Sequence, residues 1–143
     1  MTASTHKEVV QATKESVWTF LEDKEQWATL MPGYLHHELK DSGEMIWVFE
    51  GDFGIIKKPV KVSLKVIEAI PHQQLSFTLE GLSDNTNGDG YFMIEEQALV
   101  GHLNLKAGGF MAAMINPILE NYVPATTESL VQAMTKKIEA IYV

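Results

Sequence analysis

The sequence predicts an α+β fold in which an antiparallel β-sheet packs against a long C-terminal helix, with two short helices after the first strand. Apolar residues recur at helical spacing in residues 13–33, and they do so again from residue 126 onward. Between these regions, consecutive segments alternate apolar and polar residues without a helix between them. One-sided alternation of this kind is typical of an antiparallel sheet with one buried face. The expected order is β-α-α-β-β-β-β-β-β-α, in a single domain that covers residues 1–143.

The composition excludes several classes of function. The 143 residues carry a formal net charge of -8, no cysteine, and 11 basic residues that are all lysine. Without cysteine the chain has no disulfide, no thiolate zinc site and no cysteine nucleophile. An acidic chain without arginine is poorly suited to nucleic acid and to two-pronged binding of phosphate. The first residues lack the apolar core of a signal peptide, so we expect a cytoplasmic location.

Local signals place the first strand and the two short helices. Residues 5–11 have the character of a short strand. A candidate N-cap, Thr13, precedes the first set of apolar residues at helical spacing. In residues 23–26, an aspartate followed three positions later by a glutamine predicts a capping box for the second helix. Pro32 and Gly33 end that helix.

The strands follow as alternating segments around residues 44–50, 60–66, 74–80, 91–95 and 99–105. The inward positions on this alternation are all apolar: Met45, Trp47, Phe49, Val62, Leu64, Leu75, Phe77, Leu103 and Leu105. Residues 84–90 are rich in asparagine and glycine, which tolerate positive φ, and are predicted to form a surface hairpin turn.

The C-terminal region is predicted to be helical. Residues 110–115 have a helical composition, and Pro117 and Pro124 are each expected to restart or kink the helix. From residue 126, apolar residues that include Leu130 and Met134 line one stripe. This stripe needs an apolar partner, and the inner face of the sheet is the large one that the pattern offers.

The chain shows no strong catalytic or metal-binding motif. His36 and His37 are adjacent, so on a strand they point to opposite faces and do not chelate one metal. No serine lies in a nucleophile elbow, and no serine–histidine–aspartate set is evident. We therefore predict no catalytic residue, no metal and no cofactor. Tyr91 or Tyr34 offers a hydroxyl to the predicted interior.

The methionines have two interpretations. Met111, Met114 and Met134 fall in the C-terminal helical region, and Met45 and Met93 fall on strands. They either pack the core or line an adaptable apolar pocket, as flexible thioethers do at permissive binding surfaces. The sequence leaves both interpretations open.

Several motifs resemble those of a known family. Val17-Trp18, Leu21-Glu22-Asp23 and Leu30-Met31-Pro32-Gly33 resemble the opening of proteins like the G-type subunit of carbon monoxide dehydrogenase. Gly51 with Phe53-Gly54, residues 67–71, Gly88-Asp89-Gly90 and Ala107-Gly108-Gly109 resemble the same family's punctuation between elements. The order of elements resembles the START-like helix-grip (SRPBCC) superfamily, which includes polyketide cyclases and lipid-transfer domains.

This resemblance implies a helix-grip fold, in which a curved sheet wraps around the C-terminal helix and encloses a cavity for an apolar molecule. We expect the chain to bind or carry a small hydrophobic ligand that is lipid-, polyketide- or aromatic-like. The residues expected to line the cavity are Met45, Trp47, Phe49, Val62, Leu64, Leu75, Phe77, Tyr91, Met93, Leu103, Leu105, Met111, Met114, Leu130 and Met134.

Two other functions remain as alternatives. The first is a cyclase, dehydratase or isomerase that uses the same cavity, with Tyr91 or a histidine as the acid–base group. The second, suggested by the resemblance to the carbon monoxide dehydrogenase protein, is an accessory protein that recruits a larger enzyme to a membrane. The acidic charge argues against attraction to anionic lipid, whereas the apolar stretch from Phe110 to Leu119 favours membrane contact.

Overall fold

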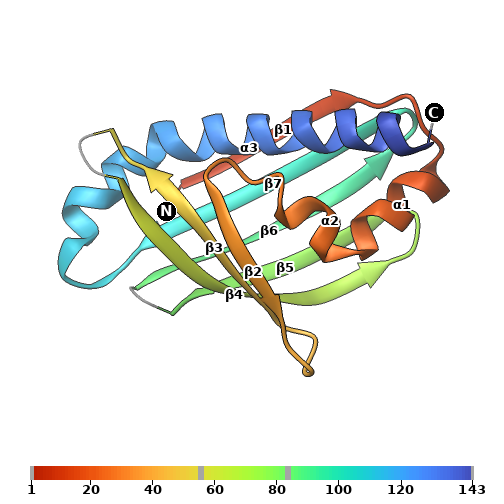
Figure 1. Cartoon of the computed structure of the whole chain (residues 1–143). Helices are drawn as coiled ribbons and strands as arrows, with labels where there is room; N and C mark the ends of the chain where they lie inside the picture. Colours follow the sequence, from red (N-terminus) through yellow and green to blue (C-terminus); the bar gives the residue numbers. More distant parts are fainter. Residues whose placement is uncertain (1, 55–56, 83–84, 143) are drawn as a thin grey trace.

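A curved sheet wrapped around one long helix forms the body of the protein (Figure 1). The computed structural model describes residues 2–54, 57–82 and 85–142. In these ranges a seven-stranded antiparallel sheet has the order β1-β7-β6-β5-β4-β3-β2. The elements are β1 (Thr2–Val9), α1 (Lys14–Glu22), α2 (Lys24–Ala28), β2 (Tyr34–Leu39), β3 (Met45–Asp52), β4 (Lys57–Ile70), β5 (Gln74–Gly81), β6 (Thr86–Glu95), β7 (Ala98–Ala107), the short 3₁₀-helix η1 (Gly109–Met111) and α3 (Ala112–Tyr142). The predicted fold class and helix-grip layout are confirmed.

The two short helices begin where the sequence predicts. The Thr13 side chain accepts a hydrogen bond from the Ser16 backbone N–H (3.1 Å) and caps α1. The Asp23 carboxylate accepts from the Glu25 backbone N–H (3.3 Å) and caps α2. The preceding strand, β1, begins and ends earlier than the predicted residues 5–11, because residues 2–9 pair with β7.

Two tryptophans fasten these helices to the inner face of the sheet. The indole N–H of Trp27 donates to the Leu21 carbonyl (2.9 Å) near the end of α1, and that of Trp47 donates to the Ala28 carbonyl (3.0 Å) at the end of α2. The last carbonyls of a helix have no partner inside the helix, so these bonds satisfy groups that would otherwise be buried alone. The Trp27 ring also lies 5.9 Å from the Phe77 ring and 5.1 Å from the Phe92 ring. Helices and sheet therefore share one aromatic core.

The prediction of a surface turn over residues 84–90 is wrong from Thr86 onward, because β6 begins there. Gly88 and Gly90 have no positive φ; their role is to allow close packing. A Cβ atom on Gly88 would overlap the Asn104 carbonyl oxygen of β7, and one on Gly90 would lie 2.7 Å from the Phe77 ring. Glycine at these positions lets the aromatic ring lie flat against the strand.

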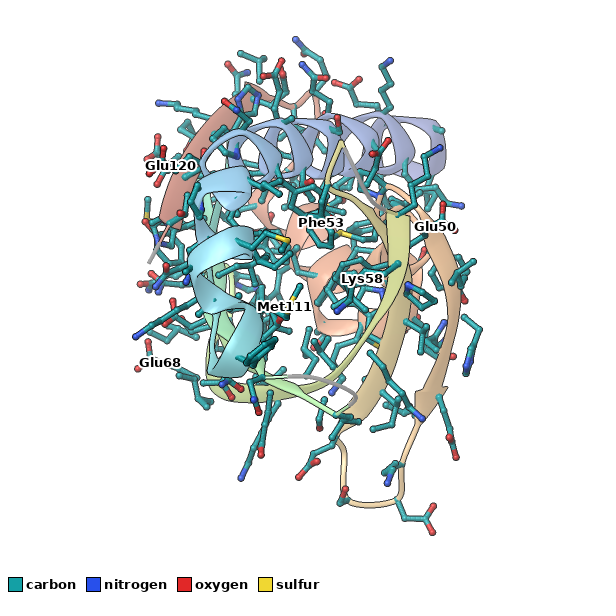
Figure 2. The ribbon with its side chains drawn as sticks, turned by 90° about the vertical axis from the view of Figure 1, so that its left-hand side faces the viewer. Glu50, Phe53, Lys58, Glu68, Met111 and Glu120 are labelled. Atoms are coloured by element: carbon teal, nitrogen blue, oxygen red, sulfur yellow. The ribbon has the colours of Figure 1, made fainter. Side chains whose placement is uncertain are left out.

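Helix α3 does not restart at its prolines. It continues from Ala112 to Tyr142 with Pro117 and Pro124 inside it. Its first turns lie at an angle to the rest, and the bend falls near Glu120 (Figures 1 and 2). Proline cannot donate to the carbonyl four residues earlier, which for Pro124 is that of Glu120, so the bend has a local cause.

The first turns of α3 are tied to the end of β7. The Asn116 side chain accepts a hydrogen bond from the Ala107 N–H (2.8 Å) and donates to the Ala107 carbonyl (2.9 Å). Between the two elements the chain turns at Gly109, which has a φ of 70° that favours glycine. This double bond fixes the start of the helix beside the open end of the sheet.

Candidate ligand-binding site

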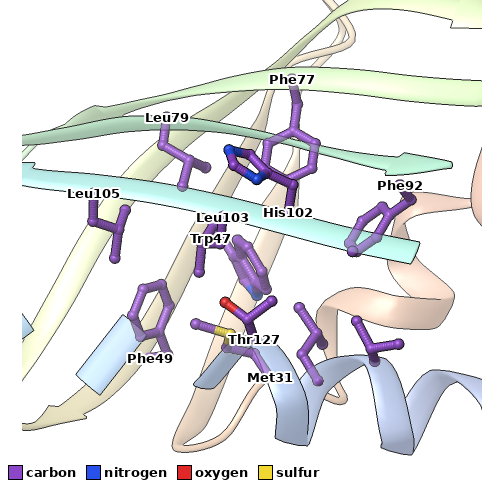
Figure 3. A pocket seen from close by; sticks show the side chains of 13 residues that line it. Met31, Trp47, Phe49, Phe77, Leu79, Phe92, His102, Leu103, Leu105 and Thr127 are labelled. Atoms are coloured by element: carbon purple, nitrogen blue, oxygen red, sulfur yellow. The ribbon is translucent and has the colours of Figure 1, made fainter. Parts of the chain in front are cut away.

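Two small spaces lie between the sheet and α3. The first has a volume of about 10 Å³ and is walled mainly by β3, β5, β7 and α3 (Figure 3). The second, of about 20 Å³, lies beside the first half of α3. A water molecule needs roughly 10–15 Å³, whereas pockets for small molecules have about 300–1,000 Å³. Side chains therefore fill the interior in this conformation, and the cavity implied by the resemblance is not open.

Two larger clefts lie at the end of the molecule where α3 begins, which Figure 2 views end-on. One has a volume of about 190 Å³ and is lined by Phe53, Lys58, Asn85, Thr86, Ala107, Gly108, Phe110, Met111 and Ile115. The other has about 490 Å³ and is lined by Asp52, Phe53, Gly54, Pro117, Ile118, Asn121, Tyr122 and Ala125. Both reach the solvent, and both share wall residues with the second inner space.

Phe53 separates the clefts from the interior. Its ring is 8% exposed and lines both clefts and the second inner space. The chain reverses behind it: the Asp52 carboxylate accepts from the Gly54 N–H (3.0 Å), and Gly54 has a φ of 85°. The ring folds back over Gly51, where a Cβ atom would lie 2.6 Å from it, and lies 5.0 Å from the Tyr122 ring. One loop side chain thus closes the end of the sheet against α3.

The structure brings about half of the predicted cavity residues together. Those that wall the inner spaces are Trp47, Phe49, Val62, Phe77, Leu103, Leu105 and Leu130. Four others are buried in the core but do not border either space: Met45, Leu64, Leu75 and Met134.

Tyr91 and Met93 do not lie in the interior; both are on the outer face of the sheet. In β6, Phe92 pairs with Leu75 on one side and Gly101 on the other, and cross-strand partners share a face. Tyr91 therefore shares the outer face with His102, on which its ring stacks with centroids 4.8 Å apart. Residues 91–94 are all apolar or aromatic, so their sequence carries no alternation that could have fixed the phase.

Met111 and Met114 also lie outside the interior. They are 42% and 51% exposed, and Met111 lines the smaller cleft. The bond from Asn116 to Ala107 holds this segment beside the end of the sheet, with its methionines toward solvent. The interpretation of these two residues as interior lining is wrong.

Sequence reasoning missed other residues that wall the inner spaces. They are Met31, Phe53, Val60, Leu79, Thr86, Phe92, Gly101, Ile115, Leu119, Tyr122, Thr127 and Val131. Leu79 continues the alternation of β5, and Ile115, Leu119 and Tyr122 extend the apolar stripe of α3 toward its start, so a signal was present for these four. Phe53 carried none, because a phenylalanine between Asp52 and Gly54 has the appearance of a turn residue.

Few polar side chains border the inner spaces. The Thr127 hydroxyl is already bonded to the Val123 carbonyl (2.7 Å). The Tyr122 hydroxyl is buried, and no described residue offers it a well-oriented hydrogen bond. Burial raises the pKa of Tyr122; the nearby Thr126 hydroxyl opposes this rise and the Asp52 carboxylate adds to it. Tyr122 therefore stays a neutral phenol that can donate a proton in a hydrogen bond.

The acid–base groups that the enzymatic alternative invoked lie elsewhere. Tyr34 is hydrogen-bonded to His37 Nδ1 (2.7 Å), and His37 Nε2 to the Glu25 carboxylate (2.8 Å), beside α2. The His102 ring is stacked on Tyr91 and bonded to the Thr5 hydroxyl (2.7 Å) on the outer face. Within the described residues, no group of three potential metal ligands comes together.

Comparison with known proteins matches this architecture. A protein-family model aligns with residues 1–140. A conserved protein from Geobacillus kaustophilus superposes with a TM-score of 0.78 at 17% identity, covering 99% of this chain and 98% of its own. A START superfamily protein from Mycobacterium smegmatis gives 0.75 at 15% identity, with 97% and 98% covered. The Zhui aromatase/cyclase from Streptomyces sp. R1128 gives 0.65 at 14% identity, with 96% and 93% covered. A search of curated proteins finds no match.

Proposed function

The chain belongs to the START-like, polyketide cyclase-like superfamily, and from this premise we propose that it binds a small hydrophobic molecule between the sheet and α3. The ligand enters at the end where α3 begins, and Phe53 controls its passage. The observation that carries the proposal is the continuity of the apolar walls from the clefts to Trp47.

Shared residues define this route in two steps. The smaller cleft and the second inner space share Phe53, Thr86 and Ile115, and the two inner spaces share Phe49, Leu79 and Leu105. Side chains alone separate the solvent from the centre of the core along this line. A ligand that displaces them buries its apolar surface, which contributes roughly 25 cal/mol per Å². That gain offsets the cost of rearranging the side chains that fill the interior.

Binding of an apolar probe tests this function. We expect isopropylnaphthalene to bind the protein with saturation at one molecule per chain and to change tryptophan fluorescence, because Trp47 is in the wall of the inner space. Leu130→Phe should weaken binding about tenfold, a loss of about 1.4 kcal/mol. Leu130 and Ile138 are both buried on α3, but only Leu130 borders an inner space, so Ile138→Phe is the matched control. An equal effect of both substitutions, or no saturable binding, would refute an interior site.

The interior walls favour binding over acid–base catalysis. Catalysis of a cyclase or isomerase type needs a titratable group within hydrogen-bond reach of the substrate. Of the groups that were expected to serve, Tyr91 and His102 lie on the outer face of the sheet. Tyr122 is the titratable hydroxyl that the described residues place against the inner space. A binding role asks no more of it than a hydrogen bond.

A second function, contact with a membrane, is favoured by the exposure of Phe110. This side chain is 99% exposed next to the exposed Met111 and Met114, at the same end as the clefts. Among the described residues, no helix is long and apolar enough to cross a bilayer. Lipid contact would therefore take place through these side chains at the surface.

Vesicle sedimentation tests the membrane function. If these side chains insert, the protein should sediment with vesicles of neutral phosphatidylcholine, and the double substitution Phe110→Ser, Met114→Ser should reduce the bound fraction at least fivefold. Leu39 and Leu82 are also about half exposed but lie on other elements, so replacing them with serine is the control. Equal sedimentation of all variants would exclude this surface.

A further inference from the structure

The Tyr122 hydroxyl stands at the junction of the inner space and the larger cleft. The side chain lines both, and its ring lies against that of the gating residue Phe53 with centroids 5.0 Å apart. When Phe53 moves aside for a ligand, Tyr122 becomes part of the exposed wall. Any molecule with its apolar body toward Trp47 would leave its outer end near this hydroxyl.

This hydroxyl has hydrogen-bonding capacity that the fold does not use. Its oxygen is buried, and no described residue pairs with it in good geometry. Buried polar groups are normally hydrogen-bonded, and those that are not need an explanation. The Thr127 hydroxyl, one and a half turns further along α3, shows the ordinary situation, since it bonds to the Val123 carbonyl (2.7 Å).

The surroundings of Tyr122 determine which ligand group it suits. The Asp52 carboxylate is close enough to contribute to the raised pKa of Tyr122, so it would repel a second negative charge at this point. The neighbouring walls of the inner space are apolar: Phe49, Val60, Val62, Leu79 and Leu119. A neutral acceptor such as a ketone, ester or alcohol oxygen fits this environment, and a carboxylate does not.

We infer that Tyr122 is a specificity-determining residue that donates a hydrogen bond to a neutral oxygen at the outer end of the ligand. The ligand class is then an apolar molecule with a carbonyl or hydroxyl group, rather than a pure hydrocarbon or a fatty-acid anion. This inference rests on the proposed function, because it requires a ligand in the inner space. It adds the position and the chemistry of the polar end.

Three probes of nearly equal shape test the inference: methyl naphthyl ketone, isopropylnaphthalene and naphthoate, each measured by equilibrium dialysis. Tyr122→Phe should weaken binding of the ketone about 3- to 10-fold, the range that one net hydrogen bond supplies, and leave the hydrocarbon unchanged. Tyr142→Phe, at the other end of α3, should change neither. Asp52→Asn should strengthen binding of naphthoate about threefold or more, which wild-type protein should bind more weakly than the ketone.

The outcomes separate the anchor from the function itself. If the hydrocarbon binds but Tyr122→Phe affects the ketone and the hydrocarbon equally, the anchor is wrong and the proposed function stands. If naphthoate binds more tightly than the ketone, the neutral-ligand class is wrong. If no probe binds the wild-type protein, the proposed function fails and the anchor fails with it. The melting temperature without ligand is the control for folding: a hydroxyl without a partner predicts that Tyr122→Phe does not lower it.

Discussion

Replacing Trp27 with alanine is expected to lower the free energy of unfolding by about 3–5 kcal/mol, the range for truncating a large buried aromatic side chain. Trp27 is fully buried and contacts three other aromatic rings, those of Trp47, Phe77 and Phe92. It also holds the end of α1 through the Leu21 carbonyl. Its removal therefore leaves a cavity, and it takes a hydrogen bond from a buried acceptor. Urea denaturation followed by circular dichroism measures the effect.

A second substitution at the same site separates the two contributions. Trp27→Phe keeps a ring against Phe77 and Phe92 but removes the indole N–H, and the lost hydrogen bond alone is expected to cost about 1 kcal/mol. Some additional loss follows from the smaller ring, so Trp27→Phe should fall clearly between wild type and Trp27→Ala. If Trp27→Ala costs less than about 1.5 kcal/mol, the aromatic cluster does not organise the core as described.

Replacing Phe53 with alanine is expected to speed the uptake of isopropylnaphthalene at least tenfold. Phe53 is the side chain common to both clefts and the second inner space, so its truncation joins these volumes. Stopped-flow tryptophan fluorescence measures the association rate. Stability should fall as well, because the ring is buried against Tyr122 and over Gly51.

The control for Phe53 is a substitution that enlarges the same space without opening it. Val60 lines the second inner space but neither cleft, and it is buried. Val60→Ala should therefore strengthen binding by making room while leaving the association rate close to that of wild type. If Phe53→Ala and Val60→Ala change the rate equally, Phe53 is not the gate, and ligand reaches the interior by another route.

Alternation predicted the central strands well because each has one wet face. In β4, Val60, Val62 and Leu64 are buried and the residues between them are more exposed, and β5 follows the same rule. The method failed at β6, where residues 91–94 contain no charged or amide side chain to mark the outer face. There the orientation is set by the register with β5 and β7, which is a property of the assembled sheet.

The candidate site was harder to predict than the fold, because it depends on groups that come together only in three dimensions. Phe53 belongs to a loop that folds back over a glycine, and no periodic pattern describes such a loop. Tyr122 continues the stripe of α3, but its unpaired hydroxyl can be recognised only once its neighbours are placed. The bulk of the interior lining is a matter of hydrophobic pattern, whereas its gate and its polar point are matters of packing.

The double hydrogen bond between Asn116 and Ala107 has a consequence for the energy of each binding cycle. A primary amide that engages both the N–H and the carbonyl of one residue acts as a neighbouring strand would, so the start of α3 behaves as a rigid jaw. The opposite jaw is a single turn that carries Phe53. Only that turn has to change its conformation when the mouth opens, so the conformational entropy at stake is that of a few residues rather than of a whole helix.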